Sequence, residues 1–151
     1  MASHKASCTG LTILLVCALR SVGIAARAVG TPLWAKGTGN HTWVEFHDGN
    51  DWHFTGASEQ DPAGHDRGWF VSEAAKAIPN SRHAIYATLW DRHHEGATFF
   101  PMVWSPSDRS VVAEDVTYRY FTNSPATRTM APIAILQSLL DHHHDSLEKI
   151  M

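Results

Sequence analysis

The segment "KASCTGLTILLVCALRSVGIAARAVG" occupies residues 5–30, and it fits two different structures. An early lysine, an apolar run and an Ala-Arg-Ala triplet are the ingredients of a secretory signal peptide. Against this interpretation, Arg20 interrupts the apolar run, and the small-residue triplet lies well beyond its end. We therefore prefer a helix that begins near Cys8 and leads through a turn into a strand.

Residues 7–22 have the spacing of a helix. Ser7 is suited to the N-cap, and Gly23 to the C-terminal cap. Apolar side chains recur at spacings of three and four residues, at Leu11, Leu14, Leu15, Ala18, Leu19 and Val22. Ile13, Val16 and Cys17 make the remaining faces apolar as well, so we expect this helix to be buried on most sides.

The two cysteines, Cys8 and Cys17, do not form a disulfide framework. On one helix their Cα atoms would lie about 13 Å apart on opposite faces. A disulfide requires Cα atoms within about 7 Å, so we expect two free thiols. Free thiols suit a reducing compartment or a catalytic cysteine. We expect Cys17 to lie in the core.

The bulk properties favour one soluble domain over residues 1–151. The net charge of -3 gives no electrostatic reason to expect a nucleic-acid partner. The longest apolar run, at residues 11–19, is too short to span a membrane, which takes about 20 residues. We expect no cofactor and no membrane span, and the composition leaves the compartment open.

The rest of the chain predicts an α+β domain, with the N-terminal helix packed on a mainly antiparallel sheet. A hairpin is predicted over residues 40–56, with the turn at an Asp-Gly pair. Other predicted elements are strands at 24–30, 83–90, 98–104 and 116–122 and a short helix at 71–78.

A C-terminal amphipathic helix is predicted over residues 131–150. Such a helix usually packs on its own core. The alternative is a homodimer surface, with Leu136, Leu140 and Leu147 as the contact stripe.

Four motifs in order resemble the transglutaminase-like superfamily, whose members have a papain-like Cys-His core. They are Cys8 at a helix start, "GIAARAV" at 23–29, "NHTWVEF" at 40–46, and Trp52 after a hairpin turn. The continuation also resembles bacterial transglutaminase-like domains. The resemblance implies a cysteine-dependent hydrolase or acyl transferase that acts on an amide or ester bond of a peptide or small substrate. It places the motif-bearing core at 7–125, in a short or N-terminally trimmed form.

The resemblance makes Cys8 the nucleophile and His41 its base. A thiol reacts as the thiolate, which a helix N-terminus or a neighbouring imidazolium favours. Free N–H groups at the helix start could also bind an oxyanion. In a strand, His41, Trp43 and Glu45 share one face. If that face looks onto the helix start, Cys8 and His41 can meet.

The third catalytic residue departs from the family pattern. If the Asp-Gly pair forms a two-residue turn, Gly56 lies opposite His41, where the family has its acid. Glu59 could reach back to His41 if the loop turns, and Asp61 is a second choice. A different turn length would place Ser58 opposite His41 instead.

Trp34 is the candidate for completing the oxyanion hole, and Trp43 is a candidate substrate wall. We expect Trp43, Trp52, Trp69 and Trp104 to be core residues first. The missing acid at position 56 keeps a non-catalytic binding or structural module as the alternative function. The chain has 11 histidines, but none has the spacing of a zinc site, so no metal is expected. A histidine-rich metal-binding protein is the third and weakest alternative function.

Overall fold

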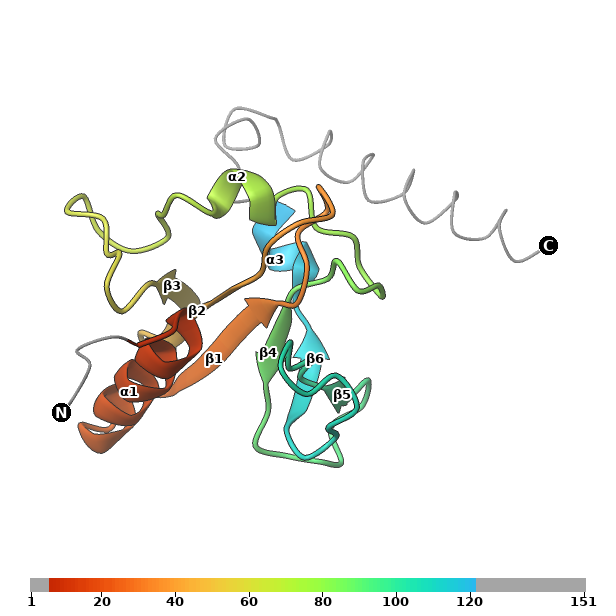
Figure 1. The fold of residues 1–151 in the computed structure, drawn as a ribbon. Helices are drawn as coiled ribbons and strands as arrows, with labels where there is room; N and C mark the ends of the chain where they lie inside the picture. Colours follow the sequence, from red (N-terminus) through yellow and green to blue (C-terminus); the bar gives the residue numbers. More distant parts are fainter. Residues whose placement is uncertain (1–5, 122–151) are drawn as a thin grey trace, which may run out of the picture.

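The computed structural model describes residues 6–121, which form a six-stranded sheet with helices on both faces (Figure 1). The strand order is β3-β2-β1-β4-β6-β5, and every neighbouring pair is antiparallel. The elements are α1 (Cys8–Ser21), β1 (Ala26–Thr31), β2 (His41–His47), β3 (Trp52–Thr55), α2 (Val71–Ala74), β4 (Tyr86–Thr88), β5 (Thr98–Phe99), β6 (Val112–Asp115) and α3 (Thr117–Phe121). The predicted α+β class and antiparallel sheet are confirmed.

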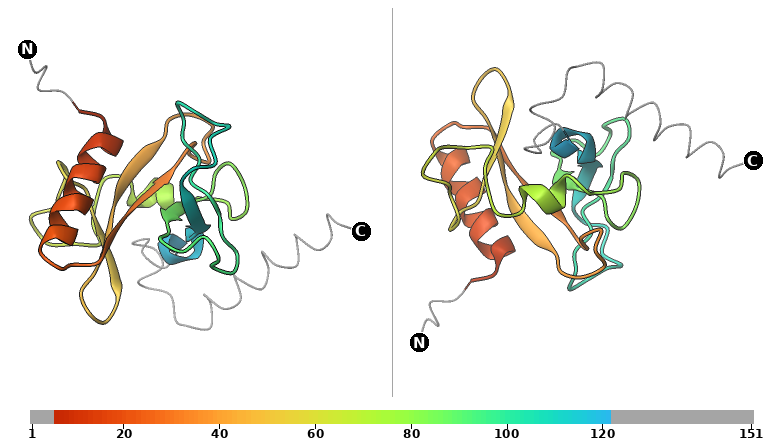
Figure 2. Two further views of the ribbon diagram at one scale, coloured as in Figure 1. Left: turned by 90° about the horizontal axis from the view of Figure 1, so that it is seen from below. Right: turned by 90° about the horizontal axis from the view of Figure 1, so that it is seen from above.

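The two faces of the sheet bury different clusters. Helix α1 packs against β1 and β2, where Val16 meets Ala26 and Val44 (Figures 1 and 2). The opposite face carries the larger core, in which residues of α2 and α3 surround Trp43. Because side chains alternate along a strand, Val44 and its neighbour Trp43 serve these two different cores.

Both predicted caps of α1 are confirmed. The Ser7 side chain accepts a hydrogen bond from the Gly10 N–H at 3.1 Å. At the other end, Gly23 adopts φ +82° and donates its N–H to the Arg20 carbonyl at 3.1 Å. A positive φ is the conformation in which glycine closes a helix at least cost.

The prediction that α1 is buried on most sides is wrong. Only Thr12 and Val16 are buried, while Leu14 is 67% exposed and Cys17 is also exposed. Within residues 6–121, the sheet covers one side of this helix and nothing covers the other. Cys8 and Cys17 are both free, as predicted, but Cys17 is not a core residue.

The turn of the β2–β3 hairpin is longer than predicted. His47 pairs with Trp52, and the Asp48 N–H donates to the Asp51 carbonyl at 3.1 Å, so four residues form the turn. The Asp48 carboxylate closes it by accepting from the N–H groups of Asn50 at 2.8 Å and Asp51 at 2.9 Å. This Asx geometry stabilises the longer turn over a two-residue one.

The prediction of a strand at 116–122 is wrong, because α3 occupies Thr117–Phe121 and the strand β6 precedes it. The Asp115 carboxylate accepts hydrogen bonds from the Thr117 N–H at 2.9 Å and from its hydroxyl at 2.5 Å. Such a bond from the N–H two residues on is an Asx turn that leads into the helix, a signal that the alternating tyrosines of this segment mask. α2, β4 and β5 are shorter than predicted. The predicted helix at 131–150 and its leucine stripe lie outside the described residues.

A buried polar network ties the sheet to α3. Arg27 donates from Nε to Glu45 at 2.7 Å and from Nη1 to Glu114 at 2.7 Å. The Tyr120 hydroxyl donates to Glu45 at 2.8 Å, and the Trp43 indole N–H donates to Tyr120 at 2.8 Å. Arg27 and Glu45 are direct cross-strand partners, with 4% and 3% of their side chains exposed.

We expect Arg27→Leu to lower the free energy of unfolding by about 3–5 kcal/mol, because it leaves the Glu45 carboxylate buried without its cation. Urea unfolding followed by circular dichroism measures this loss. The control is Arg109→Leu at an exposed position, which should change stability by less than about 0.5 kcal/mol. Equal stability of the two variants would contradict a structural role for the pair.

Candidate active site

His41 opens β2 and is enclosed by aromatic rings. Its side chain is 6% exposed and lies on the strand face that also carries Trp43 and Glu45. The surrounding ring centroids lie at 4.9 Å for Trp69, 5.0 Å for Phe70, 5.7 Å for Trp43 and 6.5 Å for Trp34. The rings keep water away from most of the imidazole.

The structure brings Glu59 to His41. The loop after β3 turns back, so that Glu59 Oε1 lies 2.7 Å from His41 Nε2. The contact is a close approach and not an aligned hydrogen bond, because Nε2 lacks a partner in hydrogen-bond geometry among the described residues. The other carboxylate oxygen, Oε2, accepts a hydrogen bond from the Trp69 indole N–H. Glu59 is therefore held from two sides.

Gly56 makes room for this arrangement. The last hairpin pair is Val44 with Thr55, and an extension of this register past the end of β3 would place Ser58 opposite His41, as predicted for a longer turn. The prediction from a two-residue turn, Gly56 opposite His41, is therefore wrong. A Cβ atom at position 56 would overlap Cγ of Glu59 and lie 2.9 Å from its Oε1. The Glu59 side chain thus fills the space that any larger residue at position 56 would occupy.

Burial lowers the pKa of His41, and the neighbouring Glu59 offsets only part of this effect. His41 is therefore neutral at neutral pH, with Nε2 facing the carboxylate. If Nε2 carries the proton, Nδ1 has a free lone pair. Within residues 6–121, Nδ1 has no hydrogen-bond partner, so it is the nitrogen available to a second group.

Cys8 begins α1 on the stripe that faces the sheet. Thr12, one turn later, is buried and donates its hydroxyl to the Thr42 carbonyl at 3.1 Å. The hydroxyls of Thr9 and Thr42 lie 3.0 Å apart. Since Thr9 follows Cys8 and Thr42 follows His41, the starts of α1 and β2 lie side by side.

The two residues nevertheless belong to opposite faces of β2. The condition stated from the sequence, that the His41 face of the strand looks onto the helix, is not met, because Val44 and Phe46 of the other face pack on α1. Cys8 itself is half-buried. Among the described residues, no hydrogen bond joins Cys8 to His41.

The burial of the tryptophans differs from the sequence prediction. Trp43 is fully buried and Trp34 is 3% exposed, and their rings stack at 6.3 Å beneath His41. Trp69 is 58% exposed, and Trp104 is 65% exposed. A substrate wall needs accessible surface, which Trp69 has and Trp43 lacks. The sequence predicts Trp69 as a core residue first and a substrate wall only second, because its contact with Glu59 depends on a loop that only the tertiary structure closes.

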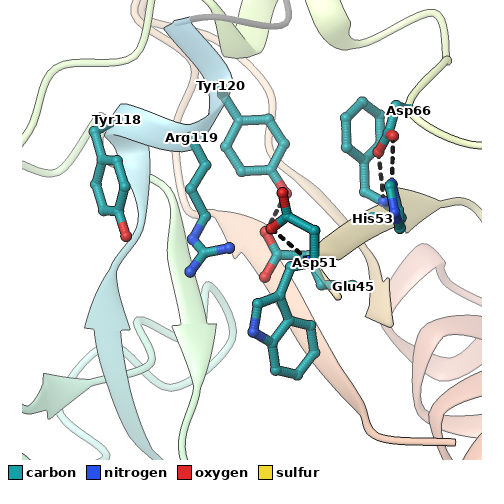
Figure 3. A pocket seen from close by; sticks show the side chains of 9 residues that line it. Glu45, Asp51, His53, Asp66, Tyr118, Arg119 and Tyr120 are labelled. Atoms are coloured by element: carbon teal, nitrogen blue, oxygen red, sulfur yellow. Dashed lines mark hydrogen bonds and ion pairs between the residues drawn. The ribbon is translucent and has the colours of Figure 1, made fainter. Parts of the chain in front are cut away.

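A separate cavity of about 410 Å³ lies at the β2–β3 edge of the sheet (Figure 3). It is lined by Glu45, Asp51, Trp52, His53, Phe54, Asp66, Tyr118, Arg119 and Tyr120. Neither Cys8 nor His41 lines it. Its buried carboxylate, Glu45, already belongs to the network with Arg27 and Tyr120, so this cavity is distinct from the His41 enclosure.

Comparison with known proteins identifies the core. Residues 1–74 match the model of the Transglutaminase-like superfamily core. This similarity assigns residues 1–74 to a superfamily made up mostly of Cys-His hydrolases and transferases. No curated protein and no solved structure matches the chain. In the part of the chain that the structure describes, no helix has the length and apolarity to cross a bilayer.

The lowered pKa of His41 predicts a pH-dependent stability. The unfolded chain takes up the proton near pH 6.5, before the folded state does, so the contribution of neutral His41 is present above pH 6.5 and is lost as the pH falls below it. Between about pH 7 and about pH 5, unfolding free energies should fall less steeply for His41→Asn than for the unmodified chain. The difference in slope is at most about 1.4 kcal/mol per pH unit.

His93→Asn, at an exposed position, is the matched control and should retain the slope of the unmodified chain. Identical slopes for His41→Asn and His93→Asn would contradict a buried, neutral imidazole.

Proposed function

We propose that this domain is a cysteine-dependent hydrolase or acyl transferase that acts on an amide or ester bond. The observation that carries the proposal is the short contact between His41 Nε2 and Glu59 Oε1 beside the start of α1. A carboxylate on one imidazole nitrogen orients the ring and favours the tautomer whose other nitrogen is basic. The match to a superfamily of mostly Cys-His hydrolases and transferases supports a catalytic role for such a histidine.

Cys8 is the nucleophile in this proposal. Its thiol proton passes to Nδ1 of His41 while Sγ attacks the carbonyl carbon and forms the tetrahedral intermediate. Free N–H groups at the first turn of α1 stabilise the oxyanion. As the C–N or C–O bond breaks, His41 returns the proton to the leaving group, and an acyl thioester remains on Cys8. Water, or an amine in a transferase, then releases the acyl group with His41 as the base.

Glu59 and Trp69 position the histidine. Glu59 holds Nε2, and the Trp69 indole holds the second oxygen of Glu59. The exposed face of Trp69 offers apolar contact to a peptide or small substrate next to His41. Hydrolysis is the favoured outcome, since bacterial relatives of this core are mostly regarded as proteases or hydrolases.

The first test is alkylation of Cys8 by iodoacetamide, measured against pH by mass spectrometry. We expect Cys8 to react at neutral pH about tenfold faster than the exposed Cys17, because the helix start and His41 favour its thiolate. His41→Ala should abolish this advantage. Equal and unchanged rates at the two cysteines would leave the alternative function, a non-catalytic module on the same scaffold.

A second test moves the carboxylate back to position 56. Glu59→Ala should slow Cys8 alkylation by about tenfold or more, because His41 loses its orienting group. Gly56→Asp alone should destabilise the fold, since its Cβ overlaps Glu59. In the double variant Gly56→Asp/Glu59→Ala the overlap disappears, and the Asp carboxylate, one bond from Cβ, takes the place of the Glu59 carboxylate.

We expect the double variant to recover both thermal stability and most of the alkylation rate. Gly56 has no left-handed φ, so its backbone accepts an L-residue. Gly56→Asn/Glu59→Ala is the matched control, which restores the packing without the charge. A double variant that labels no faster than Glu59→Ala would contradict the orienting role of Glu59.

A further inference from the structure

A cluster of two imidazoles and a carboxylate lies on β3 and its following loop, away from His41. Asp66 Oδ2 lies 2.6 Å from His53 Nδ1 and 2.9 Å from His65 Nδ1. The two imidazole centroids are 4.1 Å apart. One ligand atom from each residue falls within 4.8 Å of the other two. Figure 3 shows His53 and Asp66 side by side at the rim of the cavity.

We propose that His53, His65 and Asp66 form a binding site for a divalent transition-metal ion of the Zn²⁺ class. Two imidazoles and one carboxylate are borderline ligands that suit this class and leave a position for water. Tetrahedral zinc ligands lie about 3.3 Å apart, given metal–ligand bonds of about 2.0–2.2 Å. The observed nitrogen–oxygen contacts need to open by roughly half an ångström around the ion.

The carboxylate of the site is already positioned. Asp66 Oδ1 accepts from the Phe54 N–H at 2.9 Å, and the Asp66 N–H donates to the Phe54 carbonyl at 2.9 Å. These two bonds fasten Asp66 to the edge strand β3 and leave Oδ2 directed at the imidazoles. Asp66 has φ +59°, a left-handed conformation that aspartate tolerates better than most residues.

One histidine of the cluster contacts a supporting carboxylate, and the other is accessible to solvent. The nitrogen of His53 that faces away from the cluster, Nε2, lies 3.3 Å from Asp48 Oδ2. Metal-binding histidines usually donate this second N–H to a carboxylate, which fixes the ring and raises its basicity. His65 is 51% exposed, which gives an ion access from solvent.

The site would tether the loop that carries Glu59. Its ligands come from β3 and from residues 65 and 66, so an ion there closes the intervening segment into a ring. Glu59 lies inside that ring, and Trp69 follows it closely. The metal proposal itself is independent of catalysis, since it rests on contacts that do not include Cys8 or His41.

The experiment is calorimetric titration of the full chain with ZnCl₂ near neutral pH. His142, His143 and His144 are replaced by alanine in every sample, because a histidine run binds zinc without a defined site. We expect one Zn²⁺ per chain, bound at least about tenfold more weakly by His65→Ala. The matched control His93→Ala, also at an exposed histidine, should leave the affinity unchanged.

Asp48→Asn provides an independent arm, because asparagine can retain the turn while removing the charge behind His53. It should weaken zinc binding by about 10- to 100-fold and leave the circular dichroism spectrum unchanged. Cobalt in place of zinc should give visible absorption bands that His65→Ala removes. No stoichiometric binding, or equal affinity in the His65→Ala and His93→Ala chains, would overturn the proposal and leave a hydrogen-bonded cluster.

Discussion

The ion pair between Arg27 and Glu45 is the interaction on which the rest of the fold depends. Both side chains are almost completely buried, and two charges can remain there only if their hydrogen bonds are satisfied from several directions. The partners that satisfy them, Glu114 and Tyr120, come from β6 and α3. One pair between the neighbouring strands β1 and β2 thereby connects them to β6 and to α3, and it aligns the strand that begins at His41.

The His41 enclosure shows how a local departure from a family pattern can be compensated in space. Gly56 stands at the position where the resemblance implies an acid, and the carboxylate that lies beside His41 belongs to Glu59, three positions later. The Glu59 side chain can reach this position because Gly56 has no side chain, which would otherwise fill the same space. The aromatic rings around His41 exclude water, and this burial lowers the pKa of the imidazole and keeps it neutral.

Local physical chemistry made some features predictable from the sequence. Ser7 and Gly23 bound α1 because the hydrogen bonds of a helix end are satisfied within a few residues. Alternation identified β2 and its hairpin partner. The same reasoning missed α3, where the tyrosine pattern suggested a strand while the decisive contact was the Asp115 carboxylate on Thr117. It also predicted that α1 is buried on most sides, because apolar composition does not reveal how many faces of a helix a sheet will cover.

The sequence alone determined the class of fold, the antiparallel sheet, the helix that begins at Cys8 and the strand that begins at His41. These depend on contacts between residues close in the chain or on motifs with a defined order. Only the tertiary structure decided that Glu59 reaches His41, that Trp69 holds Glu59, and that His53 and His65 converge on Asp66. Those contacts depend on the four-residue turn and on the path of the loop after β3, which long-range packing sets and no local pattern encodes.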